Sequence, residues 1–236
     1  MSQDDYDLAS LAAYLRLTPD QVRKMAEREI IPGRRIGRDW RFSKATVHHW
    51  LEDQIGESNE IELQEVEKVL EQDVSIDHEE DSIVGMMVES AIAIPFAART
   101  KNSAIVNLCK LAADAGLLWD PDKMSEAIRS REQLHPTALE NGVALLHSRR
   151  PLTSIIGEPF LGLGVTTSGI PFGGPRGVLT DVFFLIGSID ESQHLRTLAR
   201  LSRIIQRDGF LTALRETQSP GEAIKLITEH AQEFES

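Results

Sequence analysis

The sequence predicts two folded regions of different class, a small α+β module over residues 1–56 and a larger α/β domain over residues 82–236. In the first region, helical patterns surround one short alternating stretch that is typical of a hairpin. In the second region, helical and strand-like patterns alternate along the chain. Between them, residues 57–81 carry eleven acidic residues and one lysine, a composition that predicts a linker rather than a folded unit.

The composition is typical of a globular protein in a reducing compartment. Hydrophobic residues make up 41% of the 236 residues, and the mean hydropathy is −0.21. No apolar run approaches the roughly 20 residues of a membrane helix, and the acidic first residues do not fit a signal peptide. The single cysteine, Cys109, excludes an intramolecular disulfide, and we expect it to pack in the core. We therefore expect a cytoplasmic protein with no membrane insertion.

The net charge of −12 is concentrated in one part of the chain. Residues 1–56 hold nine basic and nine acidic residues, and residues 82–236 hold fifteen basic and seventeen acidic ones, so the excess acid lies between them. From Arg16 to Lys44 there are nine basic residues against four acidic ones. The total charge therefore does not exclude nucleic acid as a partner of the first region.

The first region predicts three helices and a hairpin. Leucine and alanine at helical spacing predict the first helix over residues 8–15. Thr18 and Gln21 form a capping box that starts the second helix. The sequence RRIGRDWRF alternates around Gly37 as a hairpin does. A third helix is expected from Ser43, its cap, to Leu51.

These elements suit duplex DNA, because the second helix can enter the major groove while the basic hairpin holds phosphates or the minor groove. The stretch DLASLAAYLRLTPDQVRKMAEREIIPGRRIGRDWRFSKATVHHWLED resembles the excisionase and MerR-type winged helix-turn-helix family in the order of its helices and in its R-x-G-R-x-W-R-F wing. Modules of this kind also dock proteins, and that alternative stays open. We expect DNA contacts from Arg23, Lys24, Arg28, Arg34, Arg35, Arg38 and Arg41.

Two interpretations stay open for the acidic segment, residues 57–81. It is a solvated linker, or its apolar residues line one face of a short helix through which two copies of the chain form a homodimer. Those apolar residues are Ile61, Val66, Val69 and Leu70. The high charge favours the linker, because the apolar surface is too small to fold alone.

Residues 82–236 are long enough to bury a full hydrophobic core. Strands are expected at MMVESAIAI, Val143–Leu146, Phe160–Val165 and Val178–Ile186. Helices are expected over NSAIVNLCKLAADAG, from Asp120-Pro121 to near Arg131, after Asp190, and from a capping box that spans Ser219 to Glu222.

One histidine, His147, follows four apolar residues at the end of an expected strand, where the backbone gives its ring little freedom. Arg131 lies 16 positions upstream, and its guanidinium suits phosphate because it offers paired donors at constant charge. His194 falls at the start of the helix after Asp190, where the helix dipole favours a neutral ring and a bound anion. A neutral imidazole is a good nucleophile toward phosphorus, so the three residues predict a phosphoryl-transfer site. A plain surface role for His147 is the alternative.

Nothing in the sequence predicts a nucleotide site, a cofactor or a metal. Neither GLGVTTSG nor FGGPRG has the spacing of a phosphate-binding loop. His48 and His49 are adjacent, so they point to different faces of a helix, and no cysteine lies near them. We therefore expect phosphate to reach His147 from another phosphoprotein rather than from ATP.

At these residues the second domain resembles enzyme IIA of the bacterial phosphoenolpyruvate-dependent phosphotransferase system, in the fructose/mannitol class that includes the nitrogen-regulatory paralogue. The family pattern runs from Arg-Glu through a threonine and an Asn-Gly to Ile-Ala-x-Pro-His. It is filled here by Arg131, Glu132, Thr137, Asn141, Gly142, Val143, Ala144 and His147, and the resemblance covers essentially residues 85–230.

This resemblance implies a mixed-sheet α/β fold flanked by helices. It also implies that His147 accepts a phosphoryl group from the histidine-containing phosphocarrier protein, and that Arg131 and His194 line the same pocket. Leu146 stands where the family has proline, a residue that would fix the backbone entering the site. The departure predicts a looser or re-aimed imidazole ring.

The two regions together predict a phosphotransferase-system regulator, in which a phosphorylatable histidine is coupled to a DNA-binding domain. The catalytic activity expected of it is that of a protein-histidine phosphocarrier. Two alternatives stay open. One is a transport phosphocarrier that passes phosphate to a separate IIB domain during sugar uptake, and the other is a scaffold in which neither site works.

Overall fold

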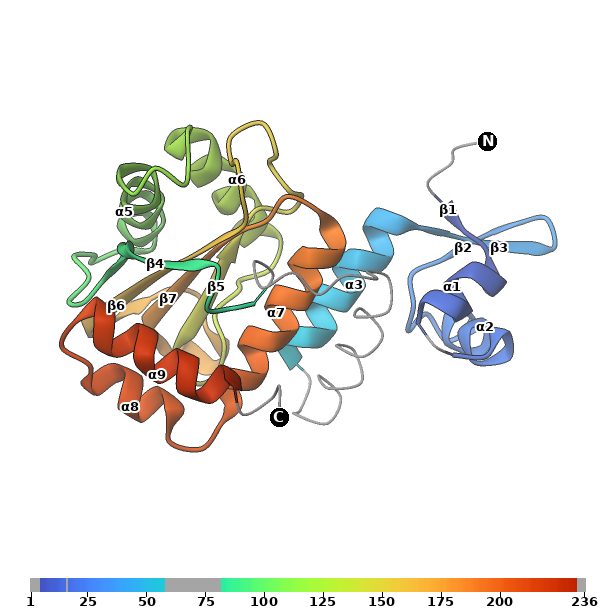
Figure 1. The fold of residues 1–236 in the computed structure, drawn as a ribbon. Coiled ribbons are helices and arrows are strands. Elements are labelled where there is room, and N and C mark those ends of the chain that lie inside the picture. Colours follow the sequence, from blue (N-terminus) through green and yellow to red (C-terminus); the bar gives the residue numbers. More distant parts are fainter. Residues whose placement is uncertain (1–4, 16, 58–81, 233–236) are drawn as a thin grey trace. The chain divides into compact units, whose positions relative to one another are not determined.

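The computed structural model of the protein describes residues 5–15, 17–57 and 82–232. The chain divides into two compact units, Met1–Ser75 and Ile76–Ser236, which are described separately below (Figure 1). The expected linker, with its alternative helix and self-association surface, lies outside the described residues apart from Glu57. None of the helices in the described ranges has both the length and the apolar composition needed to cross a bilayer.

The described part of the first unit consists of three helices and a small antiparallel sheet. The helices are α1 (Leu8–Tyr14), α2 (Pro19–Glu27) and α3 (Lys44–Glu57). The strands are β1 (Asp5–Tyr6), β2 (Arg34–Ile36) and β3 (Asp39–Ser43), in the order β1-β3-β2. The sequence predicted all of these elements except β1. Strand β1 was missed because a two-residue strand leaves no periodic signal in the sequence.

Local chemistry explains where the second helix begins. The hydroxyl of Thr18 accepts the backbone N–H of Gln21 at 3.3 Å, and the side-chain carbonyl of Gln21 accepts the backbone N–H of Thr18 at 2.8 Å. The predicted capping box is therefore confirmed. The apolar face of α1 packs against α2 and β3, and Leu11, Val22 and Phe42 are completely buried there.

The described part of the second unit is a mixed sheet with helices on both faces. Its strands are β4 (Met87–Ala93), β5 (Val143–His147), β6 (Phe160–Pro171) and β7 (Leu179–Gly187), in the order β4-β6-β7-β5. Strand β4 pairs with β6 in parallel, β6 with β7 antiparallel, and β7 with β5 in parallel. The helices are α5 (Lys101–Asp114), α6 (Pro121–Leu134), α7 (Glu191–Gln206), α8 (Phe210–Glu216) and α9 (Pro220–Gln232).

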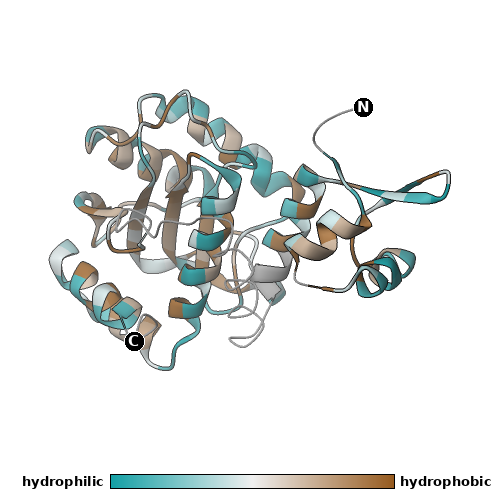
Figure 2. Cartoon of the chain, turned by 45° about the vertical axis from the view of Figure 1, so that its right-hand side comes forward, coloured by the Kyte–Doolittle hydropathy of each residue, from teal (hydrophilic) through white to brown (hydrophobic). Residues whose placement is uncertain are grey.

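Helices α5 and α6 cover one face of this sheet, and α8 and α9 lie on the other (Figure 1). Ala144 and Leu146 of β5 belong to the core on the α5–α6 face, together with Cys109. Side chains alternate along a strand, so Leu145 and His147 point to the opposite face. Figure 2 shows the central strands mainly in brown, as expected for strands buried on both faces.

Two details of the second unit differ from the sequence prediction. Helix α8 is only seven residues long and was not expected, because so short a helix depends on packing rather than on periodicity. At the start of α9, the backbone N–H of Glu222 donates to Ser219 Oγ at 3.3 Å, as expected. The carboxylate of Glu222, however, accepts from the N–H of Gln218 at 2.8 Å. The expected reciprocal bond to Ser219 is thus shifted by one residue.

Candidate functional site

The carboxyl ends of β5 and β7 bring His147 and His194 together. The strands are parallel neighbours, and His147, the last residue of β5, lies opposite Ile186 of β7. From β7 the chain passes through Ser188 and enters α7, whose N-cap is Asp190, so His194 lies near the same sheet edge. The centroids of the two imidazole rings are 4.9 Å apart, with an interplanar angle of 53°. The fold therefore pairs two imidazoles from distant parts of the sequence.

A backbone contact fixes the tautomer of His147. Its Nδ1 lies 2.8 Å from the carbonyl oxygen of Leu145. A carbonyl oxygen can only accept, so Nδ1 is the donor and carries a proton. In the neutral ring the lone pair is then on Nε2, which is the nitrogen able to attack an electrophile. Strand β5 thus sets the chemistry of the ring as well as its position.

The imidazole of His194 is held by contacts at the start of α7. The hydroxyl of Ser188 lies 3.0 Å from Nδ1 of His194, and the backbone N–H of His194 donates to the carbonyl of Asp190 at 3.1 Å. The carboxylate of Asp190 accepts from the N–H of Gln193 at 2.8 Å and caps the helix. The sequence reading missed Ser188, because a serine after a strand has no distinctive pattern. An anion beside His194 would be favoured by the dipole of α7.

Arg131 lies in the last turn of α6, just before the turn that leads into β5. Its Nη1 donates to the backbone carbonyl of His135 at 2.9 Å, and this bond orients the guanidinium. A contact between Arg131 and a phosphoryl group stays a prediction. His135 itself ends α6 as its C-cap and has an exposed side chain.

Leu146 fits the sheet as an ordinary strand residue. It pairs with Leu185 of β7, its neighbour His147 keeps the same register, and its side chain is completely buried. Strand β5 stays regular to its last residue, and the expectation of a looser or re-aimed imidazole ring stays a prediction. Packing of Leu146 on the α5–α6 face holds the backbone where proline would stiffen it.

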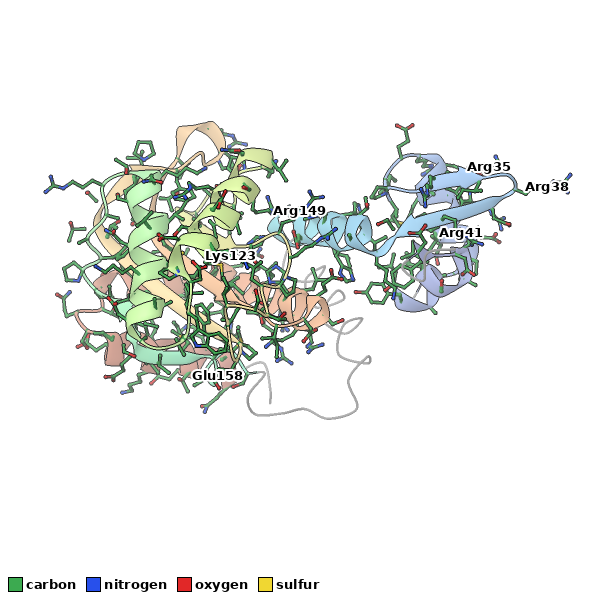
Figure 3. All side chains as sticks on the ribbon, turned by 90° about the horizontal axis from the view of Figure 1, so that it is seen from above. Arg35, Arg38, Arg41, Lys123, Arg149 and Glu158 are labelled. Carbon is green, nitrogen blue, oxygen red and sulfur yellow. The ribbon has the colours of Figure 1, made fainter. Side chains whose placement is uncertain are left out.

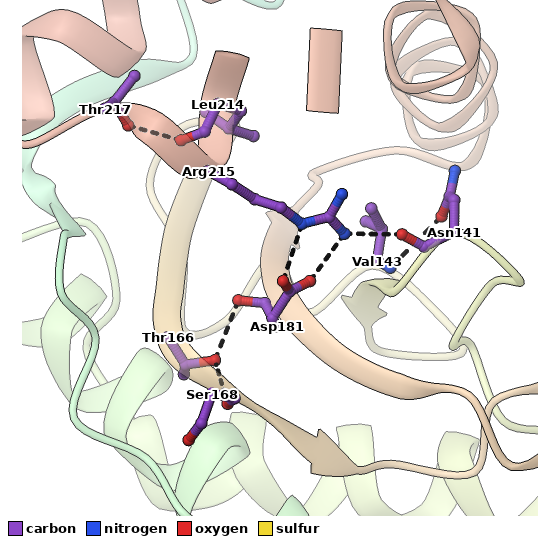
Figure 4. A network of polar contacts seen from close by, with 8 residues as sticks. All are labelled: Asn141, Val143, Thr166, Ser168, Asp181, Leu214, Arg215 and Thr217. Atoms are coloured by element: carbon purple, nitrogen blue, oxygen red, sulfur yellow. Dashed lines mark hydrogen bonds and ion pairs between the residues drawn. The ribbon is translucent and has the colours of Figure 1, made fainter. Parts of the chain in front are cut away.

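The opposite, amino-terminal ends of β5 and β7 carry a different polar cluster (Figure 4). Arg215 of α8 donates from Nε and Nη2 to both carboxylate oxygens of Asp181, each at 2.8 Å, and from Nη2 to the carbonyl of Asn141 at 2.7 Å. The hydroxyl of Thr166 donates to the carbonyls of Ser168 and Asp181 at 2.9 and 3.2 Å. These bonds tie α8 to β7 and to the turn before β5, and they tie β6 to β7.

In the first unit, the basic residues of the hairpin are the candidates for nucleic-acid contact. Figure 3 shows Arg38 at the tip of the hairpin, with Arg35 and Arg41 on its two strands. Arg35 and Arg38 are exposed, and Arg41 is half-buried. Lys24 in α2 and Arg28, the C-cap of α2, are exposed as well. The hairpin therefore presents guanidinium groups outward from the unit's own core.

Two of the predicted DNA contacts are already engaged in ion pairs. Arg34 Nη2 lies 2.7 Å from Asp5 Oδ2, and Arg23 Nη1 lies 2.9 Å from Asp20 Oδ1. Both arginines are largely exposed, so these pairs are weak and a phosphate can compete for either guanidinium.

The adjacent histidines of α3 meet different residues. Nε2 of His48 lies 3.3 Å from the hydroxyl of Tyr14, whereas Nδ1 of His49 lies 3.0 Å from a carboxylate oxygen of Glu52. Their two rings therefore diverge, as expected for neighbours on a helix.

Comparison with known protein families matches both regions of the chain. Residues 86–230 match the family described as phosphoenolpyruvate-dependent sugar phosphotransferase system, EIIA 2, and residues 6–55 match a helix-turn-helix domain. The fructose-specific EIIABC component of Bacillus subtilis is 25% identical over 150 residues, which cover 63% of this chain. The chain spans only 23% of the length of that relative.

Solved structures show the same fold for the second unit. The crystal structure of nitrogen regulatory protein IIA-Ntr from Neisseria meningitidis aligns with a TM-score of 0.55 at 20% identity, over 61% of this chain and 98% of that one. Enzyme IIA mannitol from Escherichia coli, solved in complex with phosphorylated enzyme IIB mannitol, aligns with a TM-score of 0.54 at 19% identity, over 61% and 97% of the two chains. The mixed sheet flanked by helices is therefore the fold of these IIA proteins.

Proposed function

Because the chain belongs to the phosphoenolpyruvate-dependent sugar phosphotransferase system EIIA 2 family, we propose that its second unit accepts a phosphoryl group on His147. The observation that carries the proposal is the pairing of His147 with His194, whose ring centroids are 4.9 Å apart. In this pair, Nδ1 of His147 donates to the backbone carbonyl of Leu145. The proposed donor is the histidine-containing phosphocarrier protein. The catalytic residues of this proposal are His147, His194 and Arg131.

In the proposed step, the lone pair on Nε2 of His147 attacks the phosphorus of the donor's phosphohistidine. A new N–P bond forms as the donor's N–P bond breaks, and the donor's imidazole leaves with the electron pair of that bond. Nδ1 of His147 keeps its proton, and the carbonyl of Leu145 stabilises the positive charge that develops on the ring. His194 and Arg131 are proposed to bind the phosphoryl oxygens, where fixed donors lower the barrier.

Incubation with the general phosphotransferase proteins and labelled phosphoenolpyruvate tests this proposal. Wild-type protein is expected to gain acid-labile label, and His147→Ala is expected to gain none. His135→Ala is the matched control, because His135 is an exposed histidine of the same unit. Equal labelling of wild type and His147→Ala would refute the assignment, and an unlabelled wild type would favour a scaffold.

We further propose that the first unit binds duplex DNA through its hairpin, and that phosphorylation of His147 regulates this binding. The exposed Arg35 and Arg38 support DNA as the partner. Phosphorylation would add a charge of about −1.5 to −2 at His147, and this change in charge is the proposed signal. Arg38→Ala is expected to weaken binding and to reduce the slope of log affinity against log salt by about 1. Arg176→Ala, an exposed arginine of the second unit, is the control. Identical DNA affinity of native, His147→Ala and phosphorylated protein would exclude the coupling.

A transport phosphocarrier is the second candidate, and it is supported by the Escherichia coli relative that was solved with phosphorylated enzyme IIB. In this role, phosphate on His147 would pass to a separate IIB domain during sugar uptake. A chase of the labelled protein with IIB and sugar distinguishes the two functions. Rapid loss of label favours transport, whereas retained label together with altered DNA affinity favours regulation.

A further inference from the structure

An ion pair between a half-buried lysine and a buried carboxylate joins α5 to α6 beside the strand that carries His147. Nζ of Lys101 lies 2.8 Å from Oε2 of Glu132, whose side chain is only 2% exposed. The same ammonium group donates to the carbonyl of Phe172 at 3.0 Å and lies 4.7 Å from the centroid of the Phe172 ring. A buried carboxylate needs such partners, because desolvation of an unpaired charge is costly. The position of Glu132 is therefore closely defined.

The other oxygen of Glu132 holds the turn between α6 and β5. Its Oε1 accepts the backbone N–H of Thr137 at 3.1 Å and also accepts the hydroxyl of Thr137. The neighbouring Arg131 donates to the carbonyl of His135 at 2.9 Å. Two consecutive side chains at the end of α6 thus hold the first and last residues of the turn over residues 135–137.

This turn pairs with the edge of β5 that faces away from β7. The N–H of Leu145 donates to the carbonyl of Thr137 at 3.3 Å, and the N–H of Leu139 donates to the carbonyl of Val143 at 2.8 Å. The carbonyl of the same Leu145 accepts Nδ1–H of His147 at 2.8 Å. A continuous path of contacts therefore runs from Lys101 and Glu132 through Thr137 and Leu145 to the imidazole.

We propose that Glu132 is a positioning residue for His147. By holding Thr137 against the edge of β5, it fixes the carbonyl of Leu145 and with it the tautomer that leaves the lone pair on Nε2. Lys101 acts one step further out, because it neutralises and orients the carboxylate. The effect on the transfer rate rests on the proposed function of His147, whereas the effect on the tautomer does not.

The test measures the tautomer and the transfer rate in the same set of variants. Glu132→Gln keeps the side-chain volume and removes the charge, and Thr137→Val replaces the hydroxyl with a methyl group. In both, nitrogen NMR of His147 is expected to show a smaller fraction of the Nδ1–H tautomer. The rate at saturating phosphocarrier is expected to fall about tenfold, equal to about 1.4 kcal/mol. The half-saturating concentration of the donor is expected to stay unchanged, because neither Glu132 nor Thr137 is proposed to contact the donor.

A second pair of variants guards against loss of folding. Lys101→Arg keeps the ion pair and is expected to match wild type, whereas Lys101→Met is expected to follow Glu132→Gln. Glu140→Gln is the control, because Glu140 is an exposed partner of Arg176 at 3.6 Å. Wild-type tautomer and rate in Glu132→Gln and Lys101→Met, with lower stability alone, would overturn the proposal. A shifted tautomer in variants of a protein that never accepts phosphate would support the positioning role and refute the function.

Discussion

At their amino-terminal ends, β5 and β7 are tied to α8 by Arg215, which donates to both carboxylate oxygens of Asp181 and to the carbonyl of Asn141. At their carboxyl-terminal ends, the same two strands present His147 and bring it within 4.9 Å, ring to ring, of His194. Opposite charges meet at the first end and satisfy one another. At the second end, two groups that can each exist with or without charge are placed side by side.

This difference shows how one pair of strands can separate stability from chemistry. The Arg215–Asp181 pair is bidentate, and it holds α8 in a defined position against β7. The imidazole pair supplies the proposed nucleophile and its neighbour. Substitutions at the amino-terminal end should therefore change the free energy of unfolding, and substitutions at the carboxyl-terminal end should change the rate of phosphoryl transfer.

The largest effect is expected from Gly142→Ala, at the amino-terminal end. Gly142 has φ +84°, and an added Cβ would lie 2.9 Å from Nη2 of Arg215 and 3.2 Å from the carbonyl of Leu179. Backbone strain and the displaced ion pair should together lower the free energy of unfolding by about 3 kcal/mol, measured in urea. Phosphoryl acceptance per folded molecule should be unchanged.

Gly177→Ala is the control for that substitution. Gly177 also has a positive φ, +75°, but an added Cβ would meet nothing within 4 Å. It should therefore lose only the conformational part, about 1–2 kcal/mol. Equal losses in the two variants would mean that the polar cluster adds nothing at this end of the sheet.

His194→Ala tests the carboxyl-terminal end. Alanine is compatible with α7, but the buried imidazole and its contact with Ser188 are lost, so the free energy of unfolding should fall by about 1–2 kcal/mol. Loss of the second imidazole should slow phosphoryl acceptance about 100-fold, equal to about 2.7 kcal/mol of barrier. Rapid-quench labelling measures this rate. A rate close to wild type would show that the imidazole of His194, although near His147, does not contribute to phosphoryl transfer.

Arg215→Lys should have a smaller effect. Lysine keeps the charge but loses the paired donors that meet Asp181, and the two side chains are 33% and 26% exposed. Solvent screening limits the expected loss to about 1 kcal/mol in the free energy of unfolding. A larger loss would indicate that the bond to the carbonyl of Asn141 carries most of the energy.

The smallest effect is expected at Cys109 of α5, in the hydrophobic core. Burial raises the pKa of its thiol to about 11, so little reactive thiolate exists near neutral pH. Iodoacetamide at pH 8 should leave the native protein unmodified, and Gly142→Ala should react faster than His194→Ala. Because the folded state keeps this proton longer than the unfolded chain, stability should fall as the pH rises from about 9 toward 11.

The starts of helices and the position of strand β5 were predicted best from the sequence. The capping residues Thr18, Asp120 and Asp190 start α2, α6 and α7 as expected, because the signal and its effect lie within one helical turn. Strand β5 was also placed within one residue, since Val143 to Leu146 form a continuous apolar run. The mixed sheet was expected only from the resemblance to enzyme IIA.

Features set by distant contacts could not be predicted. Strand β6 continues past Val165 to Pro171 because it pairs with β7 there, and the sequence has no apolar run to show it. The ion pair of Lys101 and Glu132 depends on the topology that brings α5 beside α6. Motif spacing named His147 and His194, but only the parallel ends of β5 and β7 explain why they meet.

The bond from His147 to the carbonyl of Leu145 also predicts which positional isomer the proposed phosphorylation produces. Phosphohistidine exists as two positional isomers, and a ring whose near nitrogen is engaged with the backbone yields only the isomer modified at the far nitrogen. An antibody that recognises this isomer should report the modified protein in cell extracts, whereas one raised against the other isomer should stay silent.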